Sequence, residues 1–94
     1  MLIKKIKTIL AVGSIAIDTI KTPRGDRDNI IGGSATYFAL SAGLLAPVKL
    51  VGVVGNDFPV DGWGLFKSRN VNTENIQIVN GETFRWGGRY NLDY

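Results

Sequence analysis

The sequence predicts an α/β fold, the first part of a doubly wound parallel sheet with further strands projecting from it. Residues 8–12 and 48–54 are short, continuous apolar runs of the kind that forms strands buried on both faces. Between them, residues 35–46 are apolar and rich in Ala, which is typical of a buried helix. Strand, helix and strand in this order imply a right-handed crossover between two parallel strands.

The composition excludes several kinds of chemistry. The chain has 94 residues, enough for one small domain or a piece of a larger one, and its 45% hydrophobic and 20% charged residues are ordinary for a globular protein. It contains no Cys and no His, so it has no disulfide, no thiolate metal site and no imidazole base. Acid–base chemistry is therefore left to carboxylates, lysines and tyrosines.

The net charge of +3 arises mostly in the first 30 residues, which hold six Lys or Arg against three Asp. Lys4, Lys5 and Lys7 form the only cluster, which we interpret as a solvated leader before a strand. A signal peptide is the alternative, but Gly13 interrupts the apolar run that follows. The scattered charge argues against a nucleic-acid partner, and no apolar stretch reaches the ~18–20 residues of a membrane span. We expect a cytoplasmic protein.

A second strand is expected at 15–22, where β-branched residues predominate. Asp18 belongs to this strand and, taken alone, reads as a solvated charge that protects a sheet edge from aggregation. A turn at 23–26 leads to a partner strand at 28–31.

The helix at 35–46 is expected to begin with Ser34 as its N-cap and to end before Pro47. Because it is apolar on most sides, we expect it to be buried on most sides. Gly32 and Gly33 precede it and, on local pattern alone, form only a turn.

The segment after the strand at 48–54 predicts a loop at 55–59 and a second helix at 60–69. Asp57 is expected to cap this helix, with a position facing the site as the alternative. Residues 76–79 predict a third core strand.

Residues 82–94 alternate strictly between two kinds of side chain, the signature of a strand with one buried face. The aromatic and apolar face carries Phe84, Trp86, Tyr90, Leu92 and Tyr94. Gly87 and Gly88 allow either a two-residue hairpin turn or a bulge in one long strand, and the unbroken phase of the alternation favours the long strand. Taken alone, the aromatic face indicates core packing, and Arg85 and Arg89 on the other face indicate solvated charges.

Four segments in order carry a resemblance to a known family. They are Gly13-Ser14-Ile15-Ala16-Ile17-Asp18, Gly32-Gly33-Ser34-Ala35-Thr36-Tyr37-Phe38-Ala39, Gly55-Asn56-Asp57 and Asn70-Val71-Asn72-Thr73. Their order and spacing resemble the amino-terminal part of the ribokinase-like (PfkB family) carbohydrate and nucleoside kinases. The resemblance implies a single incomplete domain over residues 1–94, with core elements at 8–14 and 32–81 and lid strands at about 15–31 and 82–94.

The same resemblance implies a substrate site. Asp18 would accept hydrogen bonds from sugar hydroxyls, because an ionised carboxylate has about four lone-pair sites. Gly32 and Gly33 would let the backbone approach the sugar. The full set of candidate substrate-binding residues is Asp18, Gly32, Gly33, Tyr37, Arg85 and Trp86.

Two departures from the family pattern concern the substrate. Tyr37 stands where the family often has Asn, and Ala16 stands where ribokinase often has Asn. Both changes remove an amide near the sugar. They leave the substrate open and argue against ribokinase itself.

The activity implied is ATP-dependent phosphoryl transfer to a sugar or nucleoside hydroxyl, with ATP and Mg²⁺ as cofactors of the full-length family member. Nothing after residue 57 resembles the D-T-x-G-A-G-D motif that carries the family's catalytic Asp, and there is no P-loop. We therefore expect this chain to hold no catalytic residue, to bind no cofactor and to be inactive alone. The alternative is a stand-alone binding or assembly module that self-associates through the lid strands. A truncated protein or a gene fragment would look the same.

Overall fold

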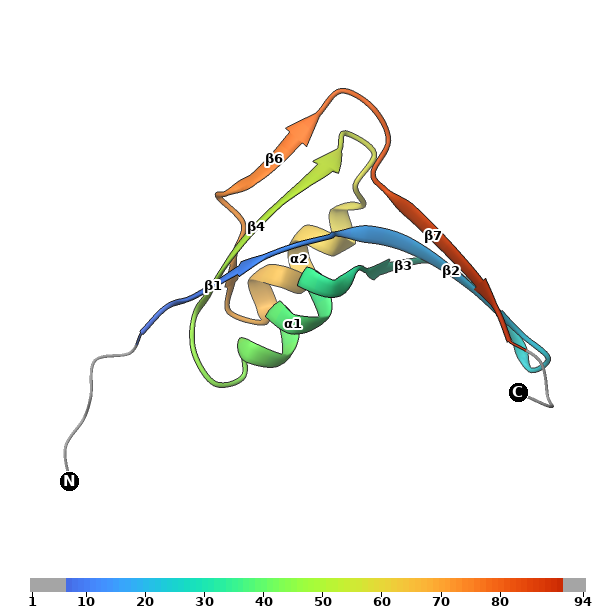
Figure 1. The fold of residues 1–94 in the computed structure, drawn as a ribbon, viewed down its shortest axis with the longest axis horizontal. Coiled ribbons are helices and arrows are strands. Elements are labelled where there is room, and N and C mark those ends of the chain that lie inside the picture. Colours follow the sequence, from blue (N-terminus) through green and yellow to red (C-terminus); the bar gives the residue numbers. More distant parts are fainter. Residues whose placement is uncertain (1–6, 91–94) are drawn as a thin grey trace.

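The computed structural model describes residues 7–90, which contain seven strands and two helices. In chain order they are β1 (Ile9–Val12), β2 (Ala16–Thr22), β3 (Gly25–Gly32), α1 (Ser34–Ala42), β4 (Val48–Gly55), α2 (Val60–Ser68), β5 (Val71–Asn72), β6 (Ile76–Val79) and β7 (Arg85–Arg89). The strands form two sheets (Figure 1).

The larger sheet, which we call the core sheet, is entirely parallel. Strand β4 lies at its centre and pairs with β1 on one side, while β5 and β6 pair with successive parts of its other side. Strand β1 begins its pairing with β4 at Ile9 and Val48, and β6 begins its pairing further along β4, at Ile76 and Gly52. The prediction of an α/β fold with a parallel sheet is confirmed.

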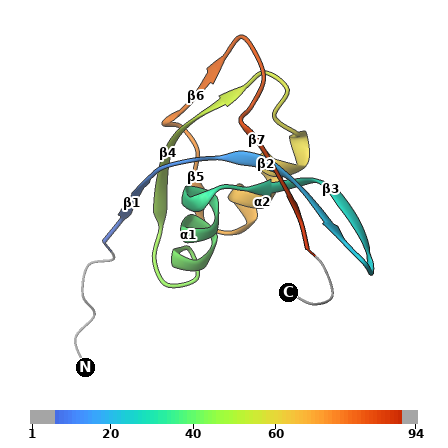
Figure 2. The same cartoon turned by 45° about the vertical axis from the view of Figure 1, so that its right-hand side comes forward.

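The smaller sheet, which we call the projecting sheet, extends away from the core sheet (Figures 1 and 2). Strand β2 is its central strand, antiparallel to β3 and parallel to β7. A register shift between Asp18 and Ile20 marks an irregularity in the pairing with β3. Only residues 13–15 separate β1 from β2, so one extended segment passes from the core sheet into the projecting sheet (Figure 1).

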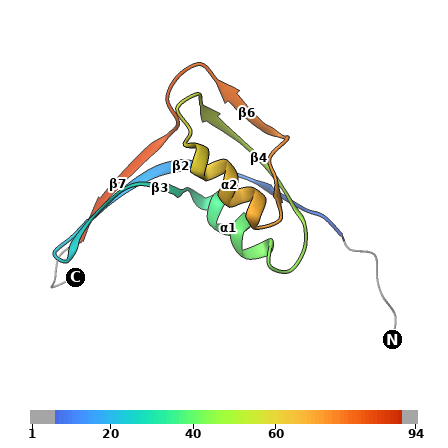
Figure 3. The ribbon, with the colours of Figure 1, turned by 180° about the vertical axis from the view of Figure 1, so that it is seen from behind.

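Both helices lie on one face of the core sheet (Figure 3). Val48, Leu50 and Val54 of β4 point toward this side and are almost fully buried, as are Ala39 of α1 and Phe66 of α2. Burying such side chains stabilises the fold by roughly 1.5–3 kcal/mol for each large one. The opposite face is open.

The first helix differs from the prediction in its two ends and in its burial. Ser34 is the first residue of α1 and not its cap, because Gly33 occupies the N-cap position with a φ of 95°. The helix ends at Ala42 and not at 46, and the chain continues in turns, with hydrogen bonds from the Leu44 and Leu45 amides to the carbonyls of Ser41 and Ala42. Burial is also one-sided, because only the positions that face the sheet are covered, whereas Tyr37 is 51% exposed.

The region around residue 71 holds a strand that the sequence did not reveal. Val71 and Asn72 form β5 and pair with Val48 and Lys49 of β4, in a segment where the sequence analysis predicted no strand. A two-residue strand is too short to show periodicity. Asn70, with a φ of 65°, provides the preceding turn.

Strand β7 decides between the two interpretations of Gly87 and Gly88, a hairpin turn or one long strand. It continues through Gly87 and Gly88, which pair with Thr19 and Ile20, so there is one strand and no hairpin. It is shorter than the predicted 82–94, because residues 82–84 form the connection from the core and 91–94 lie outside the described residues. The expected burial of the aromatic face was wrong.

Phe84 and Trp86 of this face are exposed, and the neighbouring Thr83 is buried. Phe84 is 61% and Trp86 45% exposed, while Thr83 is 2% exposed. The cause is the position of β7 in the projecting sheet, where no described helix covers Phe84 and Trp86.

Within the described residues, no helix is long and apolar enough to cross a membrane.

We expect the 94-residue chain to self-associate through the open face of the core sheet. Leu10, Val12 and Val53 are 63%, 70% and 52% exposed there, and contiguous apolar surface of this kind favours association. Sedimentation velocity should show species larger than a monomer, in proportions that rise with concentration.

Replacing Val12 and Val53 by Thr should reduce this association, because Thr keeps the β-branched shape and adds a hydroxyl. The matched control is Val60→Thr on α2, where the side chain is already 83% exposed away from the sheet. A monomer at all concentrations that binds no apolar dye would contradict the prediction.

Candidate functional site

A pocket of about 380 Å³ lies between the projecting sheet and the amino end of α1. Strand β2, the start of α1 and the region of β7 all contribute to its wall. Its lining residues are Ser14, Ala16, Asp18, Ile20, Gly33, Ser34, Tyr37, Phe84, Trp86 and Tyr90. The pocket therefore brings together four of the six predicted site residues, Asp18, Gly33, Tyr37 and Trp86, and Gly32 lies directly against Asp18.

Asp18 is the most unusual group in this pocket. It lies on the central strand of the projecting sheet and is only 6% exposed, so it is not a solvated charge on a sheet edge. Its Oδ2 accepts one long hydrogen bond of 3.4 Å from the hydroxyl of Tyr37, and its Oδ1 has no hydrogen-bond partner within residues 7–90. A buried acceptor left unpaired costs about 1–3 kcal/mol, so a ligand that donates hydrogen bonds there would recover that cost.

The two glycines make room for groups that surround the pocket. A Cβ on Gly32 would lie 2.0 Å from Oδ2 of Asp18, so the carboxylate sits directly over this backbone. Gly33 has a φ of 95°, and a Cβ there would lie 2.4 Å from the carbonyl oxygen of Ser14. At both positions, the atoms that leave no room for a Cβ belong to this chain itself: the Asp18 carboxylate at Gly32 and the Ser14 carbonyl at Gly33.

Ser14 fixes the start of α1, a role that sequence reasoning missed. Its Oγ accepts a hydrogen bond from the Ser34 amide at 3.0 Å, and its carbonyl accepts one from the Ala35 amide, also at 3.0 Å. The two serine hydroxyls are 3.1 Å apart. Ser14 belongs to the segment 13–18 that carries the family resemblance. Only the folded chain shows that it accepts hydrogen bonds from two amides at the start of α1, which have no partner within the helix.

The opposite wall of the pocket is aromatic. Trp86 pairs in register with Asp18, so these two side chains lie side by side on the same face of the projecting sheet. A Cβ on Gly88 would lie 2.4 Å from the Trp86 indole, which shows that the ring lies across this glycine. Phe84 extends the wall. The pocket thus has a polar end and an aromatic end.

Arg85 is the predicted site residue that the structure separates from the others. It precedes Trp86 on a strand, so its side chain points to the opposite face of the sheet. Its guanidinium donates a 2.9 Å hydrogen bond to the carboxylate of Asp57 and does not line the pocket. Asp57 was expected to cap α2, but Pro59 occupies the N-cap position without any side-chain cap.

The Tyr37 phenol remains a hydrogen-bond donor at neutral pH. Burial raises its pKa above 10.0, and the nearby charge of Asp18 together with the hydrogen bond between them raises it further. The phenol therefore stays protonated where an ordinary tyrosine would already begin to ionise.

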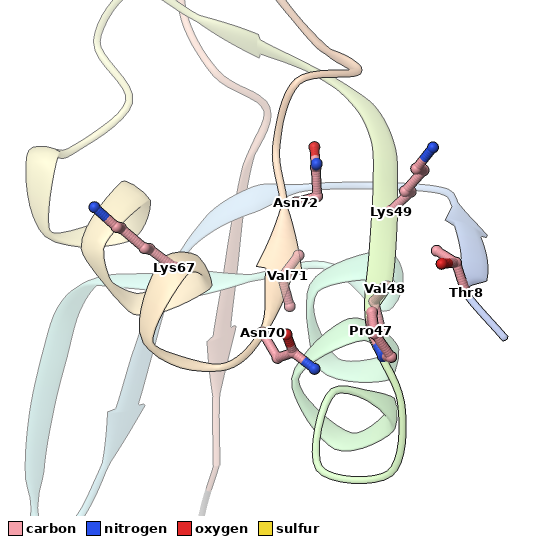
Figure 4. Close-up of a pocket in the computed structure, with 8 residues that line it drawn as sticks. All are labelled: Thr8, Pro47, Val48, Lys49, Lys67, Asn70, Val71 and Asn72. Carbon is pink, nitrogen blue, oxygen red and sulfur yellow. The ribbon is translucent and has the colours of Figure 1, made fainter. Parts of the chain in front are cut away.

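A second pocket, of about 330 Å³, lies at the amino ends of β4 and β5 (Figure 4). Lys49 and Lys67 are among its lining residues, but their amines point away from each other and do not converge on one position (Figure 4). Ligands of parallel α/β sheets bind beyond the carboxyl ends of the strands, so this position is the less suitable one. Among residues 7–90, no three His, Cys, Asp or Glu side chains gather to hold a metal ion.

Known proteins similar in sequence and fold are kinases. Over 76 residues the chain is 37% identical to the cytidine kinase of Thermococcus kodakarensis, and this match covers 80% of the chain and 27% of the relative. No protein-family model matches the sequence.

Three solved structures share the fold. Ribokinase from Cryptococcus neoformans in complex with ADP has a TM-score of 0.82 and 22% identity over 96% of this chain, and the match covers 32% of the ribokinase. The Burkholderia thailandensis nucleoside kinase in complex with inosine has a TM-score of 0.78 and 21% identity over 93% of this chain, and the match covers 32% of that kinase. The Methanocaldococcus jannaschii nucleoside kinase has a TM-score of 0.76 and 24% identity over 95% of this chain, and the match covers 34% of that kinase.

The fold is therefore that of the ribokinase-like kinases, and the chain spans about a third of the length of these structures. It spans about a quarter of the curated relative, whose name is cytidine kinase. Together these matches confirm the resemblance to the amino-terminal part of a ribokinase-like (PfkB family) kinase.

We expect Gly32→Ala to destabilise the chain because its new methyl group meets the Asp18 carboxylate. The free energy of unfolding should fall by about 1–3 kcal/mol, the usual cost of overpacking. In an Asp18→Ala background the same substitution should cost clearly less. Denaturant unfolding of the four chains in this double-mutant cycle measures the coupling.

The control is Gly64→Ala in α2, where nothing lies within 4 Å of the added Cβ. It should raise stability by about 0.5–1 kcal/mol through helix propensity alone. Equal costs of Gly32→Ala with and without Asp18 would show that the carboxylate does not lie over this glycine.

Proposed function

We propose that this chain supplies the substrate pocket and the lid of an ATP-dependent kinase that acts on a sugar or a nucleoside. The projecting sheet is the lid, and residues 1–94 form one incomplete domain of the ribokinase-like type. The observation that carries the proposal is Asp18, which lines the pocket, is only 6% exposed and has an Oδ1 without a hydrogen-bond partner among the described residues. A carboxylate in this state is suited to accept hydrogen bonds from two adjacent hydroxyls of a substrate.

The division of the pocket into two ends favours a nucleoside over a free sugar. Asp18, Ser14 and Tyr37 offer acceptors and donors to a ribose, while Trp86 and Phe84 offer flat apolar surface to a base. The curated relative named cytidine kinase and the nucleoside kinase solved with inosine support this interpretation. Cytidine and inosine are therefore the first ligands to test.

The proposal assigns no residue of this chain to ATP or to Mg²⁺. The described residues offer no cluster of metal ligands, and phosphoryl transfer depends on positioning and stabilising the transferred group. The chain's own contribution is to bind the substrate, to orient its hydroxyls on Asp18 and to cover it with the projecting sheet. We propose a cytoplasmic setting, with ATP and Mg²⁺ serving the full-length kinase and no nucleic-acid or membrane partner.

The exposed aromatic residues favour a second candidate function. Phe84 and Trp86 are 61% and 45% exposed, so the projecting sheet could serve as the interface of a binding or assembly module. Self-association through this sheet would be weakened by Trp86→Ser and unaffected by Val53→Thr on the core sheet. Association through the core sheet would show the reverse.

We expect Asp18→Asn to weaken nucleoside binding by about 1–3 kcal/mol, or roughly 5- to 150-fold, because a neutral amide replaces a charge-assisted acceptor. Nuclear magnetic resonance titrations of the chain with cytidine, inosine and ribose measure the affinities, and unfolding curves show that stability is retained. Asp61→Asn, at an exposed position of α2, is the matched control. Equal affinities of the Asp18→Asn variant and the parent chain, or no saturable binding by the parent, would contradict the proposed function.

We expect the isolated chain to transfer no phosphoryl group from ATP. The reason is that the pocket provides substrate contacts but no assigned base or nucleotide site. The chain is incubated with ATP, magnesium and the same three ligands, and product formation is followed by mass spectrometry. Turnover that depends on the ligand and persists after repurification would disprove the prediction.

A further inference from the structure

A small group of hydrogen bonds around the buried Thr83 joins the core sheet to β7. Strand β4 ends at Gly55 and is followed by the loop 56–59, and residues 80–84 lead from β6 to β7. The hydroxyl of Thr83 accepts a 3.0 Å hydrogen bond from the Gly55 amide and donates one of 2.7 Å to Oδ1 of Asp57. The Thr83 amide donates a further bond of 2.8 Å to the same oxygen. We call this group the β4–β7 junction.

The backbones at the β4–β7 junction are in direct contact. The Asn56 amide donates a 3.1 Å hydrogen bond to the carbonyl of Gly81, and the Asn56 side chain donates one of 3.1 Å to that of Asn80. A Cβ on Gly55 would lie 2.1 Å from the Gly81 oxygen, so only glycine permits this approach. Thr83 is 2% exposed, and its hydroxyl therefore has no access to water as a substitute partner.

Both oxygens of Asp57 are directed at the start of β7. Oδ1 accepts from Thr83, and Oδ2 accepts from the Arg85 guanidinium at 2.9 Å. The hydrogen bonds from Thr83, and then the pairing with Arg85, lower the pKa of Asp57 below its ordinary value of 3.8. The group is therefore an ionised acceptor at neutral pH. It makes no cap to α2, so helix capping does not explain these contacts.

The aromatic wall of the Asp18 pocket begins immediately after this junction. The carbonyl of Phe84 accepts a 2.8 Å hydrogen bond from the Ile17 amide, which starts the pairing of β7 with β2. Two residues later Trp86 pairs with Asp18. Because Thr83 lies one residue before Phe84 and three residues before Trp86, its position limits where these two side chains can lie over the pocket.

We propose that Asp57 is a positioning residue that acts through Thr83 to hold β7, and with it Phe84 and Trp86, over the Asp18 pocket. The identity of the ligand rests on the proposed function, but the positioning itself does not. Asp57 is not among the residues that line the pocket, so its effect on a ligand would be indirect. The junction lies directly before β7, the strand that carries Trp86.

The test uses the two tryptophans as reporter and internal control. Trp86 forms the pocket wall, while Trp63 packs edge-on against Phe58 in the core, with ring centroids 4.8 Å apart. Asp57→Asn and Thr83→Val should shift the indole resonance of Trp86 and leave that of Trp63 in place. Hydrogen exchange of the β7 amides and of the Ile17 amide should accelerate roughly three- to tenfold, while the β4 amides keep their rates.

Thr83→Ser is the conservative variant, because it keeps the hydroxyl that both Gly55 and Asp57 use. It should restore the Trp86 resonance and most of the slow exchange. Arg85→Gln should have a smaller effect than Asp57→Asn, since the Arg85 side chain is 48% exposed and donates only one of the three bonds to Asp57.

The proposal is overturned if Asp57→Asn and Thr83→Val leave Trp86 and the β7 amides unchanged. It is equally overturned if Trp63 and the β4 amides respond as strongly, which would indicate general destabilisation, or if Thr83→Ser behaves like Thr83→Val. Inosine affinity, measured on the same variants, should fall with the shift of Trp86. If the parent chain binds no inosine while the resonance results hold, the proposed function fails and the positioning role stands.

Discussion

The structure depends on one extended segment, residues 9–22, that belongs to both sheets. Its first half, β1, pairs in parallel with β4, and its second half, β2, forms the centre of the projecting sheet. Every buried amide and carbonyl of such a segment needs a partner. Strands β4, β3 and β7 therefore all pair with this one segment. Ser14, near its midpoint, also accepts hydrogen bonds from the first amides of α1 and so positions the helix.

The pocket follows from this alignment. Because Ser14 accepts hydrogen bonds from the first amides of α1 and lies just before β2, the amino end of the helix lies beside Asp18. The chain gives up stability there, since Asp18 is only 6% exposed and its Oδ1 has no partner within the part of the chain that the structure describes. Such local conflict is expected where function and folding make different demands, and it is the strongest reason to regard the pocket as a binding site.

The projecting sheet is attached to the core at three places with different constraints. The connection at 13–15 is continuous extended backbone, and the connection at Gly33 is fixed by a positive φ. The third, between β6 and β7, is held by the side chains of Asp57 and Thr83. Side-chain hydrogen bonds are easier to change than backbone continuity, so this connection is where the placement of the pocket wall is most open to adjustment.

The sequence by itself determined the element order, the parallel core and the three strands of the projecting sheet, because these follow from hydrophobic periodicity and from Gly and Pro positions. It also singled out Asp18 and Gly33, through the spacing of local segments. Only the tertiary structure decided the brief β5, the exposure of Trp86 and the partners of Asp57. Each of these depends on contacts between residues far apart in the chain: Asp57 and Thr83 are separated by 26 positions, and nothing in the local pattern of either predicts their hydrogen bonds.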